Sequence, residues 1–282
     1  MSQPRLGKMI GAVLAAVPII CYYIKQGKRK QDMCDCCKSS VFIALLFFYA
    51  KGLRVVVYLV VVAHPDDEVL GAGATICKLV EEGHIVDVCI LCSKAEARAN
   101  RPDDNEMQED LFASMNMLGV HDVYLGNFVD SQLNMSAHLK IVQFIEEALK
   151  RSSATRVITH HPSDLNNDHQ ITSLCCQEAA RLSMRMTANV PHIELIAFME
   201  VPSSTDWMLN HSIEAFLPNT FIEVGKKLIL KKIEALGKYK NVIRPFPHPR
   251  SANVLEGLAA YRGGQSGCNY AEAFQVVFRR EL

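Results

Sequence analysis

The sequence predicts an α/β protein built on a mainly parallel sheet with helices on both faces. From residue 53 onward, short runs rich in β-branched residues alternate with helical stretches, as in a chain of β-α-β units. The first run, 54–63, is apolar almost throughout, which is typical of a parallel strand buried on both faces. With 282 residues, 49% of them hydrophobic, the chain can bury a large core, and we expect one catalytic domain.

The helices have signals of their own. The segment 106–118 has apolar side chains three to four positions apart, and Gly119 stands where a helix commonly ends. The segment 139–149 is amphipathic, and 228–239 is rich in lysine. In chain order, the expected strands are 54–63, 85–92, 121–125, 156–159, 193–199, 220–224 and 273–278, and the expected helices are 68–82, 106–118, 139–149, 171–184, 228–239 and 254–262. Ligands of such sheets bind outside the carboxyl ends of the strands.

Charge and cysteine usage narrow the classes of function. The 30 basic and 30 acidic residues cancel, so the basic excess typical of nucleic-acid binding is missing and we expect no nucleic-acid partner. Six of the ten cysteines lie in apolar segments, where we expect small core residues of a protein in a reducing, cytoplasmic compartment. The segment 34–37 holds three more; it is compatible with metal binding or acylation, although no second pair at zinc-ribbon spacing follows.

Residues 1–50 differ in composition from the domain expected over 51–282. The run 9–24 is nearly all apolar but contains Pro18. At roughly 16 residues it is shorter than the ~20 that span a bilayer. Four interpretations stay open: a short membrane anchor, an interfacial helix, a signal-like segment, and an extension without function. If the run is an anchor, the basic residues after it place the domain on the cytoplasmic face, with membrane contact through residues 9–24.

The strongest chemical signal is His64-Pro65-Asp66-Asp67-Glu68, directly after the first expected strand. Three acids and an imidazole this close together need a neutralising positive charge, which a divalent metal ion supplies. His64 and Asp67 are three residues apart on a turn that leads into a helix, so both can face one ion. The alternative is a helix N-cap with acids in the first turn, which explains the acids but not the histidine.

A second polar segment, 159–169, follows the fourth expected strand and therefore lies at the same edge of the sheet. His169 can complete a two-histidine, one-carboxylate site with His64 and Asp67, which leaves a position for water as in a catalytic zinc site. Asp168 is a candidate to orient an imidazole through a hydrogen bond. Alone, the segment would be an ordinary polar loop; together with the first motif, it predicts a metal centre.

The two motifs together resemble the PIG-L/LmbE family of metal-dependent de-N-acetylases, in particular its bacterial LmbE-like branch. The hallmark of that family is Ala-His-Pro-Asp-Asp-Glu, here 63–68, with a later Asp-His, here 168–169. Further similar segments occur in the same order: 126–128 with Asp130, 159–162, 164–166, 200–204, 244–251, 261–263 and 271–274. The resemblance covers about residues 53–279, and residues 1–50 have no counterpart in it.

This resemblance implies a Rossmann-like domain that holds one zinc ion, or another divalent ion such as Fe²⁺, through His64, Asp67 and His169. It implies that Asp66 is the general base, which takes a proton from a metal-activated water that attacks an acetamide carbonyl. The implied substrate is an N-acetylated amino sugar or its conjugate. Further candidates are Asp168 for catalysis and Asp130, Asp164, Asn166, His248 and Arg262 for substrate binding.

Two departures from the family pattern bear on the substrate residues. Asn166 stands where one branch has a histidine, so oxyanion assistance is either missing or supplied by another group such as His248. The segment 93–98 lacks the glycine-containing pattern with an arginine that the family has after its second strand. Arg262 is expected either to contact substrate or to hold a carbonyl or acidic neighbour.

Other classes of function explain less of the sequence. A non-haem iron oxygenase also uses two histidines and a carboxylate, but such sites usually lie in β-barrels. Dinucleotide binding through Gly71-Ala72-Gly73 lacks the third glycine at the required spacing. A member of the same fold that binds a sugar without hydrolysing it stays open because of Asn166. The sequence indicates no oligomeric state.

Overall fold

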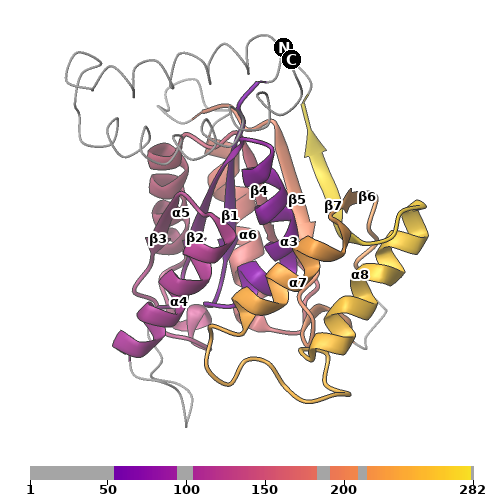
Figure 1. The fold of residues 1–282 in the computed structure, drawn as a ribbon. Coiled ribbons are helices and arrows are strands. Elements are labelled where there is room, and N and C mark those ends of the chain that lie inside the picture. Colours follow the sequence, from indigo (N-terminus) through magenta and orange to yellow (C-terminus); the bar gives the residue numbers. More distant parts are fainter. Residues whose placement is uncertain (1–53, 94–103, 183–190, 209–214, 281–282) are drawn as a thin grey trace, which may run out of the picture. The chain divides into compact units, whose positions relative to one another are not determined.

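Seven strands form one sheet in the order β3-β2-β1-β4-β5-β7-β6 (Figure 1). The computed structural model describes residues 54–93, 104–182, 191–208 and 215–280. The strands are β1 (Val57–Val62), β2 (Ile85–Ile90), β3 (Asp122–Leu125), β4 (Arg156–His160), β5 (Leu195–Met199), β6 (Thr220–Glu223) and β7 (Ala271–Arg279). The helices are α3 (Asp67–Glu81), α4 (Asp104–Leu118), α5 (His138–Ser152), α6 (Asn167–Arg181), α7 (Gly225–Leu236) and α8 (Ala252–Ser266), with short 3-10 turns η2 (Leu133–Met135) and η4 (Thr205–Trp207) in loops.

Among the described strands, only β7 runs against its neighbours. β1 pairs in parallel with β2 and β4, so that Val60 lies opposite Val88 on one side and Ile158 on the other. β7 is antiparallel to both β5 and β6, and its arrow in Figure 1 points up the page. The prediction of a mainly parallel α/β sheet is confirmed, and the reversal of β7 is an addition to it.

Each face of the sheet has its own apolar core. Val60 and Val62 of β1 face the side covered by α3, α4, α7 and α8. Leu59 and Val61 face the other side, which α5 and α6 cover (Figure 1). Successive side chains of a strand alternate between its faces, and all four of these are fully buried. The run of β-branched residues at 54–63 therefore indicated a central strand correctly, and helices cover both faces as predicted.

The described cysteines are mostly core residues. The buried ones are Cys77, Cys89, Cys92, Cys175 and Cys176, in agreement with their prediction as small apolar side chains. Cys268, just after α8, is partly exposed, so the prediction is wrong there. None of these six thiols forms a disulfide.

Helix α6 begins earlier than the sequence pattern indicated. We expected a helix from Ile171, but α6 begins at Asn167. The reason is a side-chain cap, because Asn166 Oδ1 accepts a hydrogen bond from the Asp168 N–H at 2.8 Å. The first turn of α6 therefore carries both Asp168 and His169 on a rigid element instead of a loop.

The strand order creates a crevice between the carboxyl ends of β1 and β4. The chain leaves β1 through α3 on one face of the sheet, whereas α5 leads into β4 on the other face. At such a switch point the helices diverge and leave room for a ligand. Both polar motifs of the sequence, 63–68 and 159–169, lie at this crevice.

Several sequence-based expectations fall outside the described residues. These are the apolar run 9–24, the cysteine-rich segment 34–37 and most of 93–98. Within the described ranges, no helix is both long enough and apolar enough to cross a membrane.

Candidate active site

The turn between β1 and α3 carries three of the predicted site residues. Asp66, the last residue before α3, has a left-handed backbone with φ of 106°, which residues other than glycine, asparagine and aspartate rarely adopt. Its backbone carbonyl accepts from the N–H groups of Val69 and Leu70 at 3.1 and 2.9 Å, but its side chain makes no capping bond. The N-cap interpretation is therefore wrong for the Asp66 carboxylate, which lines the cavity described below.

His64, Asp67 and His169 converge on one point at the crevice. His64 Nδ1 and His169 Nε2 each lie 3.1 Å from Asp67 Oδ2, and they lie 3.3 Å from each other. All three side chains are almost fully buried. Two imidazole nitrogens that face each other and share one carboxylate oxygen are arranged as ligands of a single cation. The structure thus brings the three predicted metal ligands together.

The triangle of donor atoms has the size that a tetrahedral zinc ion requires. Ligand atoms at the usual zinc–nitrogen and zinc–oxygen lengths of ~2.0–2.1 Å lie about 3.3 Å apart. The observed edges of 3.1, 3.1 and 3.3 Å are close to that value. Three protein ligands leave a fourth position for water or substrate. Because nitrogen and oxygen donors also suit Fe²⁺, the donor set fits a divalent ion without specifying the metal.

Buried carboxylates lie behind both histidines. His64 Nε2 is 3.1 Å from Asp168 Oδ2 and 3.3 Å from Asp130 Oδ1. His169 Nδ1 is 3.2 Å from Asp164 Oδ2. A carboxylate in this position fixes the tautomer and orientation of an imidazole ligand. The nitrogens that face Asp67 are therefore the ones available to a cation.

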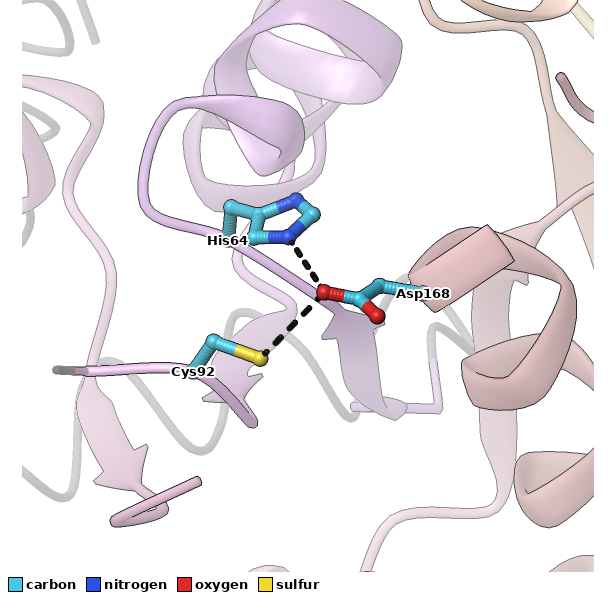
Figure 2. A group of neighbouring side chains, drawn as sticks. All are labelled: His64, Cys92 and Asp168. Carbon is cyan, nitrogen blue, oxygen red and sulfur yellow. Dashed lines mark hydrogen bonds and ion pairs between the residues drawn. The ribbon is translucent and has the colours of Figure 1, made fainter. Parts of the chain in front are cut away.

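Asp168 is itself held by the loop that follows β3. Its carboxylate accepts from the backbone N–H groups of Ser131 at 2.6 Å and Leu133 at 3.2 Å. Figure 2 shows His64 and Cys92 both pointing toward one oxygen of Asp168, with the thiol sulfur 4.0 Å away. Burial raises the pKa of the Cys92 thiol to about 12, so the sulfur stays protonated and is a poor metal ligand. We interpret this cluster as support for His64.

The site carries a surplus of negative charge. Burial alone lowers the pKa of His64 and of His169, but the facing carboxylates outweigh burial. They raise the pKa of His64 well above its ordinary value and that of His169 to about 9. A divalent ion between the two imidazoles would supply the positive charge that these carboxylates favour.

His160 lies beside the triangle but is not part of it. Its ring stacks on that of His169 with centroids 3.9 Å apart, and its Nε2 accepts a hydrogen bond from the Ala63 N–H at 2.9 Å. Burial, and then the positive charge of His169, lower the pKa of His160 to about 3. The ring is therefore neutral, and it supports His169 by packing.

The triangle lies in the wall of a cavity of about 420 Å³. This volume is enough for a ligand the size of a sugar. The other polar or aromatic side chains that line the cavity are Asp66, Asn166, Ser203, Ser204, Trp207, Arg244, His248 and Arg250. Of the predicted substrate-binding residues, Asn166 and His248 therefore reach the cavity.

Arg250 binds the predicted general base. Its Nη1 lies 3.1 Å from Asp66 Oδ2, and its Nε donates to Ser203 Oγ at 2.7 Å. The side chains of Arg250 and Asp66 are both partly exposed, and both line the cavity. The guanidinium thus orients the Asp66 carboxylate from the side of the cavity.

An aromatic pair forms another part of the wall. The rings of Trp207 and His248 meet edge to face with centroids 5.7 Å apart. Slight burial lowers the pKa of His248, and the positive charges of Arg250 and Arg244 lower it further. The imidazole is therefore neutral at pH 7 and can donate a hydrogen bond.

Three predicted substrate residues do not reach the cavity. Asp130 and Asp164 are fully buried behind the histidines, so the expectation of substrate contact is corrected for both. Arg262 lies on α8 and pairs with Glu200 through two contacts, Nε–Oε1 at 2.8 Å and Nη2–Oε2 at 2.6 Å. Of the two expectations for Arg262, the structure shows the one in which it holds an acidic neighbour.

Sequence reasoning missed Arg250, Trp207 and Ser204. The Ser204 hydroxyl donates to Asp164 Oδ1 and lies 3.4 Å from His169 Nδ1. Arg250 and Ser204 fall within segments that carry the family resemblance, 244–251 and 200–204, and Trp207 is the only tryptophan of the chain. These signals were available, but they do not show which loops return to the site.

The fold and the site together define a class of protein: an α/β domain with a two-histidine, one-carboxylate cluster at the switch point of a mainly parallel sheet. Residues 59–180 match the family model of PIG-L, described as GlcNAc-PI de-N-acetylase. Over these residues the resemblance to the PIG-L/LmbE family that was inferred from the sequence is confirmed.

Three known proteins illustrate the range of relatives. YaiS of Escherichia coli (strain K12), an uncharacterized deacetylase, is 26% identical over 187 residues, which cover 64% of this chain and 88% of YaiS. N,N'-diacetylchitobiose deacetylase from Pyrococcus horikoshii has a TM-score of 0.63 at 20% identity, covering 78% of this chain and 83% of its own. GalB of Pseudomonas putida KT2440, the 4-carboxy-2-hydroxymuconate hydratase, has a TM-score of 0.65 at 20% identity, covering 81% of this chain and 98% of GalB. The structural likenesses establish the fold, and the hydratase shows that this fold alone does not determine the reaction.

Proposed function

We propose that this protein is a metal-dependent hydrolase that removes the acetyl group from an N-acetylated amino sugar or its conjugate. The observation that carries the proposal is the triangle of His64 Nδ1, Asp67 Oδ2 and His169 Nε2, with edges of 3.1–3.3 Å, next to Asp66 at a cavity of suitable size. The PIG-L match supports amide hydrolysis as the reaction. We assign the catalytic domain to residues 51–282, and membrane contact through residues 9–24 stays a prediction.

His64, Asp67 and His169 would hold the metal, zinc in the first instance and Fe²⁺ as the other candidate. When bound in such a site, a divalent ion polarises a carbonyl oxygen and lowers the pKa of a water molecule. Asp130, Asp164 and Asp168 act on the ligands and not on the substrate, because they lie behind the histidines.

Asp66 is the general base in this proposal. Its carboxylate adjoins the metal ligand Asp67 in sequence and faces the cavity, where it can take a proton from the attacking water and pass it to the leaving amine. The left-handed backbone at Asp66 directs the side chain away from the helix end. Arg250 holds this carboxylate through Oδ2 at 3.1 Å, which fixes its orientation toward the cavity.

His248 and Trp207 are assigned to the substrate. A neutral His248 can donate a hydrogen bond to the oxygen on which negative charge develops, which is the role that the family histidine has at the position of Asn166. Asn166 instead caps α6. Trp207 offers an aromatic face of the kind on which the apolar side of a sugar ring packs.

The test is a screen of acetamido sugars for acetate release by the zinc-loaded protein. Asp66→Asn is the informative variant, because asparagine tolerates the left-handed backbone at this position whereas alanine would be strained. We expect acetate release to stop on chelation, to return with zinc, and to fall about 10²–10⁴-fold in Asp66→Asn with metal content unchanged.

Two outcomes would contradict the proposal. A folded, zinc-loaded protein that binds acetamido sugars but releases no acetate from any of them would be a sugar-binding member of the fold. Metal analysis of freshly purified protein separates the other class, since stoichiometric iron with oxygen-dependent turnover would indicate an oxygenase.

A further inference from the structure

A buried lysine and a buried glutamate contact the backbone of helix α3 from the side. Lys232 comes from α7 and Glu272 from the start of β7, and each is only 6% exposed. Lys232 Nζ lies 2.6 Å from Glu272 Oε1. Neither residue lines the cavity of the candidate active site, so the proposed reaction does not use them directly.

Both members of the pair bind the backbone of α3, at positions about one helical turn apart. Lys232 Nζ donates to the Leu70 carbonyl at 2.8 Å. Glu272 accepts from the N–H groups of Ala74 at 3.2 Å and Thr75 at 2.6 Å. In a regular α-helix the N–H of residue 74 bonds to the carbonyl of residue 70. The ion pair therefore contacts both partners of one of the hydrogen bonds that join the first turn of α3 to the rest of the helix.

One glycine of α3 makes room for Lys232, and a neighbouring glycine makes room for Met199 of β5. A Cβ at Gly73 would lie 3.0 Å from Lys232 Cγ, and a Cβ at Gly71 would lie 2.4 Å from Met199 Sδ. A larger residue at Gly73 would press on the lysine stem, and one at Gly71 would displace the Met199 side chain. The Gly71-Ala72-Gly73 pattern thus has a packing reason, which replaces the dinucleotide-binding interpretation.

The same helix α7 leads to a second contact with the first turn of α3. Tyr239, shortly after α7, donates from its hydroxyl to Glu68 Oε1 at 2.6 Å, and Glu68 Oε2 accepts from the Asp66 N–H at 3.1 Å. The turn that carries Asp66 and Asp67 is therefore fixed at Glu68 and at Leu70. Asp67 must meet two imidazoles at 3.1 Å each, which leaves little tolerance for a shift of this turn.

We infer that Lys232 and Glu272 are positioning residues, which set the first turn of α3 at the depth where Asp67 completes the metal triangle with His64 and His169. The inference rests on the proposed metal site. Stability alone is a weak reason for such a pair, because apolar residues of similar volume in place of a buried ion pair are often as stable or more stable.

A second, partly buried ion pair provides a control. Arg262 and Glu200 line the same small cavity of about 20 Å³ as Lys232 and Glu272. Within the described part of the chain, the side-chain hydrogen bonds of Arg262 go to Glu200 and Gln265, and none goes to the α3 backbone. This pair carries the same charges and is somewhat more exposed, and it does not contact the helix.

The experiment compares the double variant Lys232→Met/Glu272→Leu with the double variant Arg262→Met/Glu200→Leu in the full chain. Zinc affinity is measured by competition with a chromophoric chelator, and the visible spectrum of the cobalt(II) form reports the coordination geometry. We expect the first variant to bind zinc about tenfold more weakly with an altered cobalt spectrum. The second variant should change affinity by less than about twofold, even if its thermal stability falls as much.

If Lys232→Met/Glu272→Leu does not fold, the single variant Gly73→Ala tests the same inference. This variant retains both charges, but the added methyl group presses on Lys232 Cγ. We expect its zinc affinity to fall about threefold. That is less than the roughly 10–100-fold loss typical when a residue bonded to a metal ligand is removed. Parent-like zinc affinity and cobalt spectra in the folded α3 variants would overturn the inference. A parent protein that binds zinc but releases no acetate would instead overturn the proposed function and leave the positioning role in place.

Discussion

Asp164→Asn is expected to weaken metal binding much more than Asp130→Asn, although both carboxylates face a predicted metal ligand. His64 Nε2 has two carboxylates behind it, Asp168 at 3.1 Å and Asp130 at 3.3 Å. Within the described residues, His169 Nδ1 has one carboxylate, Asp164 at 3.2 Å. The two histidines therefore differ in how much support each loses with one substitution.

The nearby hydroxyl cannot replace Asp164. Ser204 Oγ can accept a hydrogen bond from His169 Nδ1, but the two atoms lie 3.4 Å apart and a neutral hydroxyl is a weaker acceptor than a carboxylate. An asparagine at 164 presents either an oxygen or an amide N–H to the ring, so the tautomer of His169 is no longer fixed. Loss of such a partner typically weakens metal affinity 10–100-fold, which corresponds to about 1.4–2.7 kcal/mol.

Asp130→Asn leaves His64 with its better partner. Asp168 remains, and the N–H groups of Ser131 and Leu133 keep it in place. We expect a loss of less than about threefold in zinc affinity, because one carboxylate is enough to fix the tautomer. Zinc competition titrations on both variants, with thermal unfolding of the metal-free forms as a control for folding, give the comparison. Equal losses, or a larger loss at Asp130, would refute the reasoning.

Two further predictions concern stability and are checked by chemical unfolding. Gly71→Ala should lower the free energy of unfolding by about 1–2 kcal/mol, because overpacking against Met199 exceeds the gain in helix propensity. The same change at Gly257, where a Cβ meets nothing within 4 Å, should raise it by about 0.5–1 kcal/mol, so effects of the same sign would contradict the packing argument. Tyr239→Phe should lower the free energy of unfolding by about 1–3 kcal/mol, since it leaves a buried oxygen of Glu68 without its donor. A loss below about 0.5 kcal/mol would show that water or another group replaces the hydroxyl.

The metal triangle was predictable because its members are fixed by secondary structure. His64 and Asp67 follow a strand whose apolar run is clear in the sequence, and His169 follows the next strand in the sheet. Parallel neighbours end at the same edge of a sheet, so the three side chains had to come close to one another. The β-α-β rhythm predicts that these strands end at one edge of the sheet, and the structure shows that β4 lies next to β1.

The cavity wall was not predictable in the same way. Arg250 and Trp207 lie in irregular segments, where no periodicity indicates the direction of a side chain. For Arg262 the sequence left two expectations open, and the structure decides between them, because its guanidinium pairs with Glu200. The partner of a charged side chain is decided by tertiary packing, and composition and spacing do not contain that information.

The reversal of β7 has a consequence for the site. Phe274 lies opposite Met199, the last residue of β5, so the start of β7 extends past the carboxyl end of that strand. A parallel strand in this position would begin at the opposite edge of the sheet. Because β7 is antiparallel, Glu272 lies at the edge where α3 begins, and it can meet Lys232 and the α3 backbone there. The feature of the sheet that the β-α-β rhythm did not predict is therefore the one that brings the buried ion pair to the helix carrying Asp67.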